Sequence, residues 1–154
     1  MAIEKQIDIL KKGRALILRL IENFSLEQIN QIPEGFNNNI GWNVGHLVVT
    51  QQLLCYKFSG LENGVSEEMI SKYRKGTDPK EQVIEEREWD LIKKLFLELP
   101  NSTEEDYGKG VFVSYNEYET SVGVVLDSVE KSIDFNNFHE GIHLGAILAL
   151  RKLV

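Results

Sequence analysis

Long stretches without proline constrain the fold of this chain more than any other sequence feature. The three prolines are Pro33, Pro79 and Pro100, and proline is rarely accommodated inside a helix. From Ile3 to Phe24, apolar residues recur at heptad-like spacing, which predicts an amphipathic helix. Arg14 occupies one position of its apolar face, where a core residue is expected.

Three further segments have the pattern of long helices. The one predicted from Asn43 to Phe58 is apolar nearly all round, which is typical of a buried, central helix. The next is predicted to begin at Asp78-Pro79, a cap followed by a first-turn proline, and to end at Leu99. Its predicted buried residues are Ile84, Leu91, Ile92, Leu95 and Leu99. The last is predicted from Ser128 almost to Val154.

Residues 101–127 lack a clear periodicity and predict one long irregular loop before the last helix. Four long helices, one of them buried, predict an all-α fold, namely a bundle of about four helices. A chain of 154 residues, 42% of them hydrophobic, is long enough to bury a core. Residues 1–154 are therefore predicted to form a single domain.

The charge balance restricts the partners of the chain. Seventeen Lys and Arg residues against 24 Asp and Glu residues give a net charge of −7, whereas nucleic acids and anionic membranes require a clustered basic surface. A small-molecule substrate is expected instead. Cys55 is the only cysteine, and the first residues lack the apolar core of a signal peptide, so a cytoplasmic location is expected.

Three histidines are the candidate metal ligands. His139 and His143 are four residues apart, so they lie one above the other on one helix face. That face comprises Ser132, Asn136, His139, His143, Ala146, Leu150 and Leu153. His46 lies in the most apolar predicted helix, and one divalent ion would satisfy three buried imidazoles at once. Three ligands leave a coordination position open, as in catalytic sites.

Two alternatives compete with this interpretation. A hydrogen-bonded core histidine is one, because H-x-x-x-H on a helix is a weak motif. The other is a zinc protease, since residues 139–143 fit H-E-x-x-H with Glu140 as general base. Such proteases take a third ligand downstream, and none of residues 144–154 is suitable. We therefore favour His46 as third ligand and retain Glu140 as the one acidic candidate for a catalytic base.

Two sequence blocks resemble the DinB-like (damage-inducible) superfamily. Gly41–Leu47 (GWNVGHL) is similar to its W-x-x-G-H-L block, and His139–Gly145 (HEGIHLG) to its H-x-x-x-H-x-G block. Tyr118–Ser121 (YETS) is similar to one branch of the family. The blocks together, in this order and separation, are fairly specific, and the similarity covers nearly the whole chain.

The resemblance implies a four-helix bundle of DinB-like type in which His46, His139 and His143 bind one divalent metal ion. Zinc and nickel are the metals it favours. Three imidazoles also accept copper and iron(II), and manganese is a further alternative. It also implies a homodimer. Some relatives transfer low-molecular-weight thiols such as bacillithiol, or use mycothiol for isomerisation, and many others have no assigned reaction.

Four residues near the motifs each have two interpretations. Trp42 either walls the pocket or belongs to the core, and Asn43 either caps its helix or contacts a substrate. Asn136 either hydrogen-bonds in the pocket or pairs within the core. Arg14 either holds an anionic group or forms an ion pair at its place in the bundle.

Tyr115 and Tyr118 either cover the pocket from the long loop or pack in the core.

Two functions remain open from the sequence. One is a metal-dependent enzyme, such as a low-molecular-weight-thiol S-transferase or a related metal-assisted hydrolase. The other is a non-catalytic helical scaffold that binds a metal or a small molecule. An enzyme should have a polar cavity beside the open metal position, whereas a scaffold should have a closed site or none.

Overall fold

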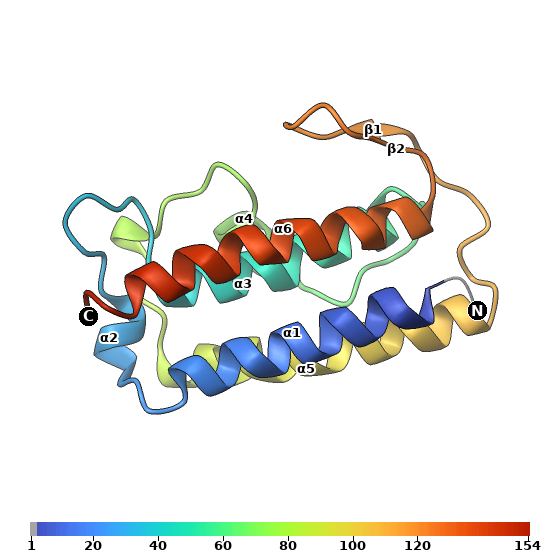
Figure 1. Cartoon of the computed structure of the whole chain (residues 1–154). Helices are drawn as coiled ribbons and strands as arrows, with labels where there is room; N and C mark the ends of the chain where they lie inside the picture. Colours follow the sequence, from blue (N-terminus) through green and yellow to red (C-terminus); the bar gives the residue numbers. More distant parts are fainter. Residues whose placement is uncertain (1–2) are drawn as a thin grey trace.

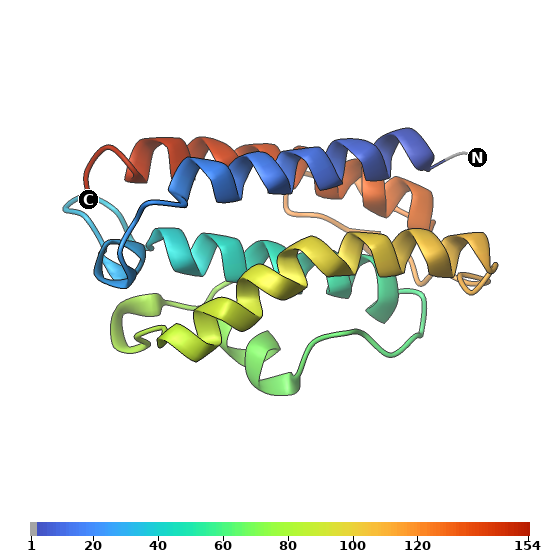
Figure 2. The ribbon, with the colours of Figure 1, turned by 90° about the horizontal axis from the view of Figure 1, so that it is seen from below.

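Four long helices pack side by side in a computed structural model that describes residues 3–154 (Figure 1). They are α1 (Glu4–Ile21), α3 (Ile40–Gln52), α5 (Glu86–Gly108) and α6 (Val129–Leu150). Both α1 and α3 pack against α5 and against α6, and Figure 2 shows α1 beside α6 and α3 beside α5. The all-α bundle predicted from the sequence is confirmed. No helix within residues 3–154 is long and apolar enough to cross a membrane.

Short elements connect the long helices. They are α2 (Leu26–Asn30), a π-helical turn η1 (Leu53–Lys57), α4 (Glu67–Tyr73), a 3₁₀ turn η2 (Pro79–Glu81) and the strands β1 (Tyr118–Glu119) and β2 (Val125–Leu126). The strands pair antiparallel, with Tyr118 opposite Leu126 and Glu119 opposite Val125. In Figure 1 the hairpin lies along the outer side of α6. It is the only sheet among the described residues.

The third long helix differs from its prediction at both ends. Asp78 and Pro79 open the 3₁₀ turn, with the Asp78 side chain accepting from the Lys80 backbone N–H, and α5 begins only at Glu86. The buried face of α5 consists of Trp89, Ile92, Phe96, Leu99, Pro100 and Thr103, so Leu91 is exposed rather than buried. The helix then continues through Pro100 to Gly108. The loop predicted for residues 101–127 therefore begins only at residue 109.

A buried arginine explains how α5 continues through its proline. Pro100 has no N–H to donate to the carbonyl of Phe96, four residues earlier. The Arg14 guanidinium donates to that carbonyl instead, with 3.0 Å between Nη1 and O. A second donor of the same group, Nη2, reaches the Leu47 carbonyl on α3 at 3.1 Å. Arg14 thus supplies from α1 a hydrogen bond that the sequence of α5 lacks.

The Arg14 charge is balanced by Glu140 on α6. Arg14 Nη2 and Nε lie 2.6 and 2.9 Å from Glu140 Oε1, and the Asn136 amide donates to the same oxygen at 3.1 Å. Burial raises the pKa of the Glu140 carboxyl, while Arg14 and Asn136 act in the opposite direction. Arg14 is fully buried, so the ion pair lies inside the bundle and joins α1 to α6.

Candidate metal centre

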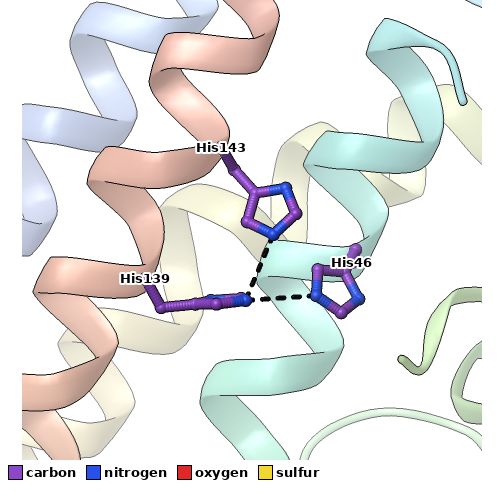
Figure 3. Close-up of side chains that lie close together, drawn as sticks. All are labelled: His46, His139 and His143. Carbon is purple, nitrogen blue, oxygen red and sulfur yellow. Dashed lines mark hydrogen bonds between the residues drawn. The ribbon is translucent and has the colours of Figure 1, made fainter. Parts of the chain in front are cut away.

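The three histidines converge between α3 and α6 (Figure 3). His46 extends from α3, and His139 and His143 extend from successive turns of α6. The Nε2 atom of His139 lies 3.2 Å from Nε2 of His46 and 3.1 Å from Nε2 of His143. Three nitrogens bound at about 2.0–2.1 Å to one tetrahedral ion would lie about 3.3 Å apart. The observed spacings are close to this value, and the three residues form a group able to hold a metal ion.

A carbonyl group orients the ring of His46. The Nδ1–H of His46 donates to the carbonyl oxygen of Tyr73 at 2.7 Å, which leaves the lone pair of Nε2 facing the other histidines. Tyr73 can come this close because residue 45 is glycine: a Cβ there would lie 2.6 Å from the Tyr73 ring. The glycine of the W-x-x-G-H-L block therefore makes room for the residue that orients the histidine.

An amide group orients the ring of His143 in the same way. The Asn43 amide nitrogen donates to the Asn39 carbonyl at 2.7 Å and to Asn38 Oδ1 at 3.0 Å. Its amide oxygen therefore faces His143 and accepts from Nδ1–H at 2.7 Å. The Nε2 lone pair of His143 is then free for a metal ion. Hydrogen bonds of this kind fix the tautomer and orientation of metal-binding histidines.

The protein environment keeps all three imidazoles neutral. Burial lowers the pKa of His46, although its hydrogen bond to Tyr73 acts in the opposite direction. Burial and the neighbouring His143 and His46 lower the pKa of His139 to about 3. Burial and His46 lower the pKa of His143 to about 4. Neutral imidazole is the form that binds metal, so the donor set fits a divalent ion.

Trp42 forms one wall beside His46. Its ring stacks on the His46 ring with centroids 4.7 Å apart and an angle of 10° between the planes. The indole N–H donates to Thr77 Oγ1 at 2.9 Å, which ties the loop after α4 to α3. Trp42 is buried, so it belongs to the core and also lines the pocket.

A cavity of about 400 Å³ opens beside the histidines. Its aromatic walls are Trp42, Phe58, Tyr118 and Phe135. Its polar groups outside the histidines are Asn38, Thr50, Lys57, Lys75, Thr120 and Ser121. The Thr50 hydroxyl lies 3.3 Å from His46 Nε2, so it is a hydrogen-bonding group close to the three ligands.

A comparison with protein-family models matches residues 9–147 to the DinB superfamily. The chain belongs to the DinB superfamily. This membership agrees with the helical bundle and with the histidines of the two sequence blocks. A search of curated proteins finds no match.

Two other residues proposed from the DinB resemblance and the motifs lie at the site. Asn43 contacts His143 through its amide rather than capping α3, because the cap is Asn39, whose side chain accepts from the Trp42 backbone N–H. Tyr118 lines the cavity and stacks on Phe58, with centroids 4.4 Å apart.

Four others lie away from the cavity and have different roles. Arg14, Glu140 and Asn136 form the buried network between α1 and α6. Of the two interpretations of Arg14, the structure shows the ion pair, and Glu140, the candidate base, faces Arg14 rather than the cavity. Glu140 is rotated by about 100° from His139 around α6, and its carboxylate is held by Arg14 on the α1 side. Tyr115 donates its hydroxyl hydrogen to the Leu54 carbonyl at 2.9 Å and packs in the core near α1.

Several cavity residues were not predicted from the sequence. Thr50 and Phe135 stand four residues after His46 and four before His139, so helical periodicity alone could have identified them. Lys57 and Phe58 come from the π-helical turn, whose extra residue changes the direction of side chains after α3. Lys75 comes from a loop, and no local pattern identifies it.

Proposed function

We propose that this chain holds one divalent metal ion, zinc or nickel, on His46, His139 and His143 and transfers a low-molecular-weight thiol to an electrophile. The observation that carries the proposal is the convergence of three neutral imidazoles beside an open cavity. Hydrogen bonds orient two of these rings, and DinB superfamily membership supports metal binding. When bound, such an ion would lower the pKa of a thiol at its open position.

The side chains of the cavity favour a thiol over hydrolysis by water. A hydrolase needs a base placed to accept a proton from the attacking water. Within residues 3–154, no carboxylate lines the cavity, and Glu140 is occupied by Arg14 in the core. A thiol that has already released its proton to solvent needs no such base. Its sulfur would form a bond to the electrophilic carbon, and the leaving group would depart with the electron pair of the broken bond.

The residues of the cavity would contribute binding and orientation. The aromatic walls would exclude water from the sulfur and the electrophile. The Thr50 hydroxyl, 3.3 Å from His46 Nε2, is close enough to hydrogen-bond to a group held by the histidines. Cys55 is not a candidate nucleophile because it is buried, and burial raises the pKa of its thiol to about 11.

The test combines metal analysis with a transfer assay. Protein purified without a nickel column is analysed for metals, loaded with zinc or nickel, and incubated with bacillithiol, glutathione or cysteine and monochlorobimane. We expect bimane–thiol adduct and chloride from the wild type. His143→Ala should lose both metal and turnover, whereas Leu148→Ala, at an exposed position of α6 outside the cavity, should keep both. Equal rates for wild type and His143→Ala with every thiol would refute the transferase and leave the scaffold function.

A further inference from the structure

The cavity beside the histidines differs in charge from the rest of the chain. The chain as a whole has a net charge of −7. Lys57 and Lys75 line the cavity, and within residues 3–154 no aspartate or glutamate does. Neither lysine forms an ion pair within that described part of the chain. A positive cavity in a negative protein attracts anions and repels cations.

A tight turn holds Lys75 at the cavity. The backbone N–H and the hydroxyl of Thr77 both donate to the Arg74 carbonyl, at 3.2 and 2.8 Å. Lys75 and Gly76 are the two central residues of this turn, and Gly76 has a positive φ of 88°, which glycine adopts without the strain of a Cβ. The Trp42 indole holds Thr77 at 2.9 Å. The turn is therefore attached to the same side chain that stacks on His46.

A second regular element holds Lys57. It is the last residue of the π-helical turn that continues α3, and Phe58 follows it on the cavity wall. The Phe58 carbonyl accepts from the Asn116 backbone N–H, and its ring stacks on Tyr118. The two lysines thus come from separate elements, each fixed to the cavity wall by an aromatic residue.

From this arrangement we propose that Lys57 and Lys75 select a ligand that carries at least one carboxylate or phosphate besides the group held at the histidines. This inference rests on the proposed thiol transfer and names the substrate class, an acidic low-molecular-weight thiol. The sulfur would lie at the histidines, and the acidic groups would lie against the lysines. Ammonium groups recognise both carboxylate and phosphate as point charges.

Binding measurements on the zinc-loaded protein test the inference without relying on turnover. The probes are 2-mercaptosuccinate, with a thiol and two carboxylates, 2-mercaptoethanol, with a thiol and no charge, and succinate and inorganic phosphate, with no thiol. Calorimetry reports binding, as does the intrinsic tryptophan fluorescence, because Trp42, one of the two tryptophans, lines the cavity. Comparing variants with the same probe cancels the intrinsic affinity of that probe for zinc.

We expect Lys57→Gln and Lys75→Gln each to weaken 2-mercaptosuccinate binding about two- to fivefold, and the double variant to weaken it about tenfold. Binding of 2-mercaptoethanol should not change. Lys94→Gln/Lys152→Gln removes the same charge from two exposed positions outside the cavity and should bind like the wild type. Added salt should reduce the difference between wild type and the Lys57/Lys75 double variant, because salt screens exposed charges.

Each result has one meaning for the inference. Equal affinity of wild type and the Lys57/Lys75 double variant for 2-mercaptosuccinate overturns it, as does an equal loss in the Lys94/Lys152 control. If neither thiol binds the metal but succinate binds in a lysine-dependent manner, the anion selection holds and the proposed thiol transfer fails. Lysine-dependent binding of phosphate but not succinate supports the inference and identifies phosphate as the acidic group.

Discussion

Arg14 donates to the Phe96 carbonyl the hydrogen bond that Pro100 cannot donate, and this leads to a quantitative prediction. Replacing Arg14 alone would leave Glu140 charged and unpaired inside the bundle, which costs about 3–5 kcal/mol. It would also leave the Phe96 carbonyl without the donor that it has at 3.0 Å, at a further cost of about 1–3 kcal/mol. Against a total stability of about 5–15 kcal/mol, Arg14→Met is expected to unfold much of the protein.

The double variant Arg14→Met/Glu140→Met removes both charges and isolates the carbonyl. In this background, Pro100→Ala restores a backbone N–H that can donate to Phe96 within α5. In the wild type the same carbonyl already has Arg14 as donor. We therefore expect Pro100→Ala to stabilise the Met/Met background by about 1–2 kcal/mol more than it stabilises the wild type. Effects of proline that are common to both backgrounds cancel in this cycle.

Urea unfolding followed by far-UV circular dichroism measures the four free energies, by linear extrapolation. The helical signal suits the assay because the four long helices dominate the fold. The reasoning is refuted if Pro100→Ala changes the free energy of unfolding equally, within about 0.5 kcal/mol, in both backgrounds. That result would mean that Arg14 does not replace the missing N–H of Pro100.

Three further predictions concern packing, reactivity and assembly. Gly45→Ala would place a Cβ 2.6 Å from the Tyr73 ring. It should therefore lower the free energy of unfolding by about 1–3 kcal/mol and weaken zinc binding in a calorimetric titration. Gly13→Ala, at a position with open space around it, should do neither. Burial raises the pKa of Cys55 to about 11, so less of its thiolate is present at pH 8 than for a free cysteine. Mass spectrometry should therefore find Cys55 modified by iodoacetamide only in urea. Rapid modification of the folded protein would contradict this. The exposed apolar residues Phe138 and Ile142 of α6 support a homodimer, which light scattering at micromolar concentration should detect; a single species of 17.6 kDa would argue against it.

Local spacing in the sequence determined the long helices and the shared face of two of the three candidate metal ligands. The face shared by His139 and His143 follows from the 3.6-residue period of one helix, which holds wherever the helix packs. The apolar character of residues 43–58 likewise indicated a central helix before its neighbours were known. The two sequence blocks were sufficient to identify the DinB superfamily, to which residues 9–147 match.

Only the tertiary structure decided which side chains meet across helices. Pro100 ends a helix by local rules, yet α5 continues because Arg14, 86 positions earlier, supplies a donor. Glu140 lies next to a candidate ligand in sequence, but the helix turns it toward Arg14 and away from the cavity. The charge of the cavity depends on Lys57 and Lys75, which a π-helical turn and a loop bring to one place. Contacts between segments distant in sequence leave no periodic signal, since each depends on how two separate elements pack.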